Sequence, residues 1–371
     1  MRRRADGPSV VAVHDARSGA QAFGLLSRAV RTLREQLLAP RRLRVSAMTA
    51  PDTGVAVGTL EEGRDWVGRR GEVRTAPAPV CELGIRNFCS LVEDGNAAYW
   101  IDGVSPPGLL LGYSFDLPWR PGGSEDRALL GQDIPLPGRY LINVACDTRF
   151  ERELRVGDTV SMVEEVLAVS DEKRTRLGCG SFVTTRMTFS NQRDEVVATN
   201  DNVMVRYTPE MAPPSDRPPV DDRRDAAAAG DGERLAPIRI HVDHRRVCHN
   251  AAATWDWFPG HHDPAYARDQ GQPTIYVSTV FFQGLLDRLV TEWAGPGAVV
   301  MRRKLQIRAS LFAGEDAVAD GRVVARTVDG GDEIVEIEGR VSGANGCCVT
   351  SEITVRRPGG AGTEPRRSTT P

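Results

Sequence analysis

The sequence presents one order of elements twice, and this repetition limits the folds open to the chain. In each half a polar stretch precedes an apolar stretch, and four strand-like runs follow. The runs are rich in β-branched residues and are bounded by Gly, Asp and Asn, as strands of an antiparallel sheet are. Two copies of one unit explain this order better than two unrelated domains. The runs are 139–151, 157–170, 176–191 and 195–207 in the first half, and 299–312, 314–327, 332–344 and 347–357 in the second.

The apolar stretches predict helices. In residues 278–295 the apolar side chains fall near one another at helical spacing, with Ser278 as a candidate N-cap and Gly295 just past the last turn. The corresponding first-half stretch is 106–119. We therefore expect an α+β fold in which one long helix lies on each antiparallel sheet.

Two breaks in composition divide the chain. Residues 209–237 are dense in Pro, Asp, Arg and Ala, lack apolar periodicity and are expected to form a linker. We expect folded units at 56–208 and 238–357, a basic, disordered extension at 1–55 and a disordered tail at 358–371. Within the extension, residues 21–38 could form an amphipathic helix. Two interpretations of the extension stay open: it is an Arg-rich organelle-targeting peptide, or the biological start is Met48 and the preceding residues are upstream sequence or a disordered arm.

Charge and cysteine content exclude several classes of protein. Residues 1–47 hold ten basic and three acidic residues, which leaves 37 basic and 47 acidic residues for the acidic remainder of the chain. We therefore expect neither nucleic-acid binding nor, because no apolar run reaches about 18 residues, a membrane span. The seven cysteines include no C-x-x-C pair, so we expect free thiols and a cytoplasmic location.

The stretch 254–271 concentrates groups that carry chemistry. It contains His261 and His262 in sequence, with Asp256 before them and Asp263 directly after. Adjacent side chains diverge, and no further ligand follows at a recognisable spacing, so we expect no metal here. An acid–base pair formed by Asp256 and His261 is the preferred interpretation.

The string D-W-F-P-G-H-H-D-P-A-Y-A at 256–267 resembles the signature of MaoC-like dehydratases, the (R)-specific enoyl-CoA hydratases. The resemblance implies a hotdog fold, in which an antiparallel sheet wraps around a long central helix. The first half is similar to the FAS1-like dehydratase half of two-hotdog members, which implies a pseudo-symmetric double hotdog of two tandem hotdog folds. The matching residues are Asp256, Pro259, His261, Asp263, Pro264 and Ala267.

The resemblance implies a hydratase or dehydratase that acts on a 2-enoyl or 3-hydroxyacyl thioester, with acyl-CoA as the expected substrate and no cofactor. Asp256 and His261 would hold the reacting water between them. A homodimer, or a hetero-oligomer with another hotdog subunit, is the expected assembly. Two further sets of residues are expected to help: Ser278 and Thr279 at the thioester oxygen, and Phe258, Pro259 and Gly260 in substrate binding.

The first half carries Asp94 and Asn96 in register with the motif, but Tyr99 occupies the histidine position. Because the pKa of a tyrosine lies near 10, Tyr99 is a poor substitute at neutral pH. We expect a degenerate site in this half, which the resemblance implies accommodates the acyl chain.

The chain departs from the motif at three places, which keeps other functions open. Phe258 replaces the motif Asn, Trp255 replaces a Gly, and Ser278-Thr279 replaces an H-G pair. One alternative is a catalytically altered acyl-CoA-binding partner subunit of a hetero-oligomeric dehydratase. Another is a hotdog thioesterase, in which Asp287 or Glu292 would act.

Two clusters of residues have less specific interpretations. The basic run Arg302, Arg303 and Lys304 could meet the phosphates of coenzyme A or form a solvated strand edge. The adjacent Cys347 and Cys348 are expected to be small strand residues.

Overall fold

The computed structural model describes residues 55–117, 119, 121, 129–175, 177–209 and 232–359. The expected helix at 21–38, Met48, most of the expected linker and most of the tail lie outside these ranges. Part of the expected linker belongs to the fold, since Leu235 is buried and its N–H donates to the carbonyl of Gly321. No helix within the described ranges is long and apolar enough to span a membrane.

The strands form one ten-stranded antiparallel sheet in the order β1-β3-β4-β5-β2-β7-β10-β9-β8-β6. The two halves join where β2 pairs with β7. All eight runs predicted from the sequence are strands, whereas the short β1 and β6 were not predicted. The strands are β1 (Arg74–Thr75), β2 (Tyr140–Phe150), β3 (Ser161–Thr175), β4 (Gly178–Ser190), β5 (Val196–Pro209), β6 (Ile238–Val242), β7 (Val299–Ile307), β8 (Glu315–Asp329), β9 (Asp332–Gly343) and β10 (Gly346–Arg357).

Because β7 lies in the middle of the sheet, the basic run 302–304 is not a strand edge. Arg303 is buried and forms an ion pair with Asp287. Arg302 pairs with Asp147 and Lys304 with Glu352. The strand-edge interpretation was therefore wrong, although Lys304 is exposed to solvent, as that interpretation expects. A contact of Arg302 or Lys304 with the phosphates of coenzyme A stays a prediction.

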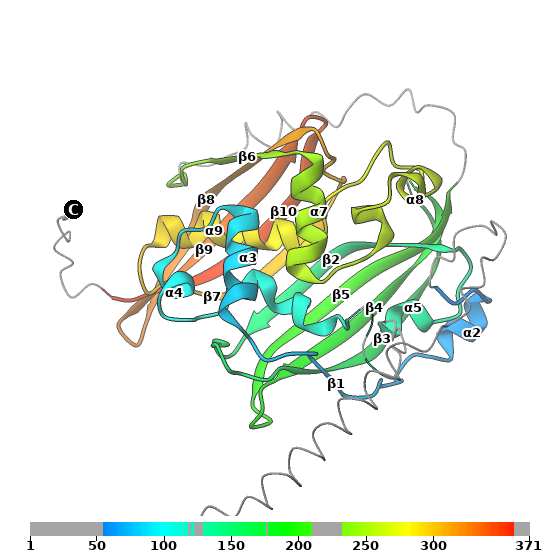
Figure 1. Cartoon of the computed structure of the whole chain (residues 1–371), viewed down its shortest axis with the longest axis horizontal. Coiled ribbons are helices and arrows are strands. Elements are labelled where there is room, and N and C mark those ends of the chain that lie inside the picture. The colour runs from blue at the N-terminus through cyan, green and yellow to red at the C-terminus, as the bar shows by residue number, and fades with distance from the viewer. Residues whose placement is uncertain are drawn as a thin grey trace, which may run out of the picture. The chain divides into compact units, whose positions relative to one another are not determined.

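The helices cover one face of the sheet (Figure 1). Helix α9 spans Thr279–Ala294 between the predicted Ser278 and Gly295, and it packs against strands β7–β10 and against other helices. Most of its side chains are buried, so it forms the core of the second half. The other helical elements are α2 (Leu60–Arg64), α3 (Glu82–Val92), α4 (Ala97–Trp100), η1 (Pro107–Ser114), α5 (Leu130–Asp133), α7 (His244–Thr254), η2 (Pro259–His261) and α8 (Pro264–Asp269).

The first-half counterpart of α9 is not the long α-helix that the sequence predicts. It is η1, an eight-residue 3₁₀ helix that begins at Pro107. The sequence there lacks continuous helix formers, because Pro106 and Pro107 precede Gly108 and Gly112. A Cβ on Gly108 would lie 2.8 Å from the Cα of Gly284 in α9, so the two backbones are in direct contact.

The two halves repeat each other in detail just before these central helices. Helices α3 and α7 have 11 residues each and end at a left-handed residue, Glu93 (φ 57°) or Trp255 (φ 59°). The next residue is Asp94 in one half and Asp256 in the other. Each carboxylate accepts a hydrogen bond from the N–H two positions later. Neither helix was predicted from the sequence, although the two helices lead directly to Asp94 and Asp256.

Candidate active site

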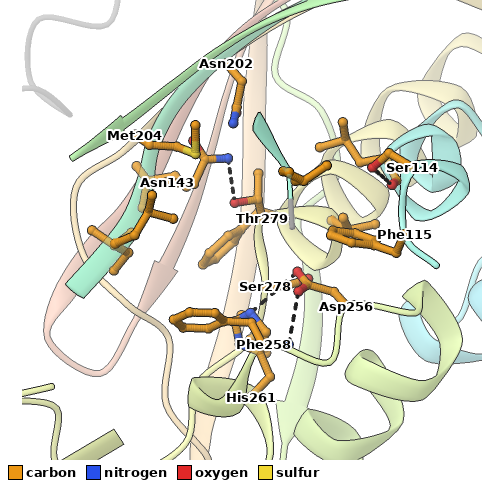
Figure 2. Close-up of a pocket in the computed structure, with 18 of the residues that line it drawn as sticks. Ser114, Phe115, Asn143, Asn202, Met204, Asp256, Phe258, His261, Ser278 and Thr279 are labelled. Atoms are coloured by element: carbon orange, nitrogen blue, oxygen red, sulfur yellow. Dashed lines mark hydrogen bonds and ion pairs between the residues drawn. The ribbon is translucent and has the colours of Figure 1, made fainter. Parts of the chain in front are cut away.

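A pocket with a volume of about 130 Å³ opens beside the start of α9 (Figure 2). Its wall comes from both halves of the chain and is mainly apolar at the end formed by the first half. The residues that carry its chemistry lie at the other end. The second half contributes Asp256, Phe258, His261, Tyr276, Val277, Ser278, Thr279, Val280, Phe282, Ile307 and Ser310, and the first half Leu111, Ser114, Phe115, Leu129, Gln132, Leu141, Ile142, Asn143, Met187, Asn202 and Met204.

Asp256 and His261 meet in this pocket. The Nε2 atom of His261 lies 3.5 Å from Oδ2 of Asp256, and the histidine is 6% exposed. Its Nδ1 atom lies 2.7 Å from the backbone carbonyl of Tyr276. Because a carbonyl only accepts, Nδ1 carries the hydrogen, and Nε2 is the ring nitrogen that faces Asp256 and the pocket.

Short local elements place the two groups. The left-handed Trp255 turns the chain out of α7, and Asp256 then accepts from the N–H of Phe258 at 3.4 Å. His261 ends the short helix η2. Pro259 and Gly260 do not line the pocket, contrary to the expected role in substrate binding. Gly260 instead admits the ring of Tyr276, because a Cβ there would lie 2.5 Å from its hydroxyl.

Phe258, which replaces the motif Asn, lines the pocket beside Asp256 and His261, the pair called the dyad below. Its ring centroid lies 5.6 Å from that of His261, and the ring of Tyr276 approaches the same histidine edge-on at 5.2 Å. His261 is therefore held in an aromatic enclosure. His262 points away and is exposed, with Nε2 bonded to the carbonyl of Trp257. No cluster of three metal-ligating side chains occurs within the described ranges.

The first turn of α9 presents backbone N–H groups at the pocket. The N–H of Ser278 donates to Oδ1 of Asn250 at 2.6 Å, so it is not available to a substrate. The N–H of Thr279 has no hydrogen-bond partner among the described residues, as expected for the first residue of a helix. Of the two residues expected at the thioester oxygen, only Thr279 presents a free backbone N–H. Asn250 was missed because it lies on α7, far from α9 in sequence.

The first half contains a second cavity, of about 230 Å³, at the pseudo-symmetric place. Asn96 and Tyr99 line it, beside the start of η1, and the beginning of β7 supplies the wall that β2 supplies to the first pocket. Asp94 is buried but does not line the cavity. Burial raises the pKa of Asp94 to about 6, although the N–H of Asn96 opposes this shift. The three residues therefore do not form an acid–base pair like that of the second half.

The two carboxylates considered for a thioesterase lie away from both cavities. Asp287 is buried within α9 and neutralised by Arg303. Burial raises the pKa of Asp287 despite this cation. Glu292 forms an ion pair with Arg288 on the helix surface. Neither carboxylate lines the pocket of Asp256 and His261 or the cavity beside Tyr99.

The sequence has relatives among hydratases. Residues 71–200 match the family model of the FAS1-like dehydratase domain region. A probable enoyl-CoA hydratase alpha subunit of Thermomonospora curvata is 35% identical over 175 residues, which are 42% of this chain and 53% of that protein. The 3-oxo-4,17-pregnadiene-20-carboxyl-CoA hydratase beta subunit of Mycobacterium tuberculosis is 30% identical over 125 residues, 34% of this chain and 95% of that subunit. The chain thus spans about half of the alpha subunit and nearly all of the beta subunit.

Solved structures share the fold. A structure described as a MaoC-like dehydratase superposes with a TM-score of 0.60 at 16% identity, covering 80% of this chain and 99% of that one. A Mycobacterium tuberculosis protein described as having a double hotdog fold gives a TM-score of 0.51 at 17% identity, covering 77% and 96%. The predicted fold, two tandem hotdogs of the α+β class, is confirmed.

Proposed function

Because the chain belongs to the MaoC-like dehydratase family, we propose that it adds water to, or removes water from, a 2-enoyl or 3-hydroxyacyl thioester through Asp256 and His261. The observation that carries the proposal is the position of this pair at one end of a mainly apolar pocket. The names of the hydratase relatives support an acyl-CoA substrate. The apolar wall from the first half would receive the acyl chain.

The geometry of the pair suits a water nucleophile. When the imidazole is neutral, Nε2 of His261 and Oδ2 of Asp256 are two acceptors 3.5 Å apart, and each can accept one hydrogen of the same water molecule. Attack by its oxygen on C3 of the enoyl group breaks one O–H bond and passes that proton to the pair. A proton from the pair then goes to C2, so the net result is one C–O and one C–H bond. Dehydration reverses these steps.

Negative charge develops on the thioester oxygen as C3 is attacked. The free N–H of Thr279 and the positive end of α9 would stabilise that charge. Oδ1 of Asn250 holds the preceding N–H, which keeps the start of the helix in place. The backbone carbonyl of Tyr276 keeps the ring of His261 oriented during proton transfer.

The names of the relatives also bear on assembly. One is called an alpha subunit and the other a beta subunit. We propose that this chain joins two such hotdog modules in a single polypeptide, with the ladder between β2 and β7 as the junction. A homodimer, or a complex with a further hotdog subunit, would then be an additional level of assembly.

The test uses trans-2-enoyl-CoA substrates of several lengths and follows both the loss of enoyl absorbance and the release of free thiol. Asp256→Asn and His261→Ala should each lower kcat/KM for hydration about 10²- to 10⁴-fold while the far-UV circular dichroism stays unchanged. His262→Ala is the matched control, because this exposed neighbour points away from the pocket. It should retain the activity of the unmodified protein.

Three results would overturn the proposal in different ways. Thiol release without loss of the conjugated enoyl group indicates a thioesterase. Neither signal, with acyl-CoA still bound, indicates a partner subunit without catalysis. Full hydration by a protein carrying both Asp256→Asn and His261→Ala removes the dyad from the mechanism.

A further inference from the structure

Two asparagine side chains in the wall of the catalytic pocket have buried atoms that lack hydrogen-bond partners. These atoms are the side-chain carbonyl oxygens of Asn143 and Asn202, neither of which has a partner among the described residues. Native proteins pair nearly all buried polar atoms, so each exception calls for an explanation. Two exceptions in one substrate pocket point to a ligand that supplies the missing donors.

Asn143 has a partial explanation within the protein. Its Nδ2 donates to Oγ1 of Thr279 at 3.1 Å, which links strand β2 of the first half to the start of α9. This amide therefore helps to position the residue that carries the free N–H of the pocket. Only the side-chain carbonyl oxygen of Asn143 lacks a hydrogen-bond partner among the described residues.

Asn202 has no such role. It projects from β5 with 5% of its surface exposed, and no hydrogen bond from its side chain is found within the described ranges. Its neighbours in the wall include Met187 and Met204, which offer no strong hydrogen bonds. Figure 2 shows Asn202 beyond Thr279, on the side away from Asp256 and His261. A whole carboxamide thus faces the part of the pocket that would receive the acyl group.

We propose that the acyl group of the substrate carries a hydroxyl remote from the thioester, and that Asn202 binds this hydroxyl. The inference rests on the proposed function and adds the substrate class. A hydroxyl can donate to Oδ1 and accept from Nδ2 at the same site, whereas a ketone could only accept and would leave Oδ1 unpaired. A plain alkyl chain would leave both groups of Asn202 buried without partners, which disfavours its binding.

The experiment compares two series of acyl-CoA thioesters of increasing length. One series ends in a hydroxyl and the other in a methyl group, matched in the number of heavy atoms. Dissociation constants are measured by titration calorimetry with the saturated thioesters, and kcat/KM with the corresponding trans-2-enoyl thioesters. At the length that reaches Asn202, the hydroxylated thioester should bind about 10- to 100-fold more tightly than its methyl counterpart.

Asn202→Leu preserves the size of the side chain and removes both polar groups. It should abolish the preference for the hydroxyl and improve binding of the methyl series. Met204→Leu, two positions along the same strand and in the same wall, is the control that should keep the preference.

Two outcomes overturn the inference. In the first, the unmodified protein binds the methyl series as tightly as the hydroxyl series at every length. In the second, Asn202→Leu retains the preference for the hydroxyl. The dissociation constants decide this question even when no thioester is hydrated. A failure of hydration with a preserved hydroxyl preference would therefore refute the proposed reaction and leave the binding role of Asn202 standing.

Discussion

Thr279 shows how one residue can serve two functions through different atoms. Its backbone N–H is a free donor at the start of α9, while its hydroxyl accepts from Asn143 across the junction between the halves. The residue before it, Ser278, has an extended backbone (φ −79°, ψ 169°), which is compatible with a following proline. The two roles can therefore be separated by substitution.

Thr279→Pro should remove the donor while leaving the helix intact, because proline is favoured at the first helical position. We expect kcat for hydration to fall about 10²- to 10³-fold with a smaller change in KM. Thr279→Val keeps the N–H but removes the hydroxyl, so it reports the loss of the bond to Asn143 alone. Equal kcat values for the two variants would contradict an oxyanion role for the N–H.

Asp94 makes the stability of the protein depend on pH. Burial raises its pKa from 3.8 to about 6, with Glu292 adding to the shift, so the folded state holds this proton more tightly than the unfolded state does. The contribution to stability is present below about pH 4 and is lost as the pH rises through about 6, by up to about 3 kcal/mol. Asp94→Asn does not titrate and can still accept the N–H of Asn96.

The gain in stability from Asp94→Asn should therefore increase between pH 4 and pH 6.5. Unfolding in urea, measured at several pH values, gives the free energy for each protein. Asp102→Asn, at an exposed position in the same segment, serves as the control and should show no such trend. A pH-independent difference for Asp94→Asn would show that this carboxyl does not shift on folding.

At the scale of elements, the sequence predicts the eight long strands and α9 because their periodicity is local, and it misses the short β1 and β6. The prediction of a long α-helix is wrong at η1, because contact with another helix constrains this segment. Gly108 lies directly against Gly284 of α9, and two prolines precede Gly108. In the candidate site, too, a local pattern identifies some residues and not others. Asp256 and His261 belong to one short motif, whereas Asn143 and Asn250 approach α9 from distant parts of the chain, and no local pattern identifies them.

The contact between η1 and α9 can be tested with Gly108→Ala. The added methyl group would lie 2.8 Å from a backbone Cα, so one of the two helices has to move. We expect a loss of about 1–3 kcal/mol in the free energy of unfolding, measured in urea. Gly95→Ala is the matched control, because no atom lies within 4 Å of its added Cβ. A stability equal to that of the unmodified protein would show that the contact relaxes without cost.

At the scale of the whole folded unit, both halves contribute to the ten-stranded sheet, to the pocket of Asp256 and His261 and to the cavity beside Tyr99. The ladder from Ala145 to Arg149 on β2 pairs with Gln306 to Arg302 on β7. Separating the halves would expose the edge of β7 and the surface of α9 that η1 covers. The second half holds the dyad, but it lacks the wall that the first half contributes.

Residues 232–371 expressed alone should therefore self-associate and lack measurable hydration, whereas co-expression with residues 1–231 should restore activity. Light scattering after size-exclusion chromatography gives the association state, and the enoyl-CoA assay gives the activity. A soluble, monomeric and fully active second half would show that the shared wall is dispensable.

The junction between β2 and β7 also determines how the site responds to dilution. When two chains build one pocket, the fraction assembled falls with protein concentration according to mass action. Here the two walls belong to one polypeptide, so each meets the other at an effective concentration that the covalent connection sets. The proposed reaction should therefore keep the same rate per molecule even where the protein is scarce.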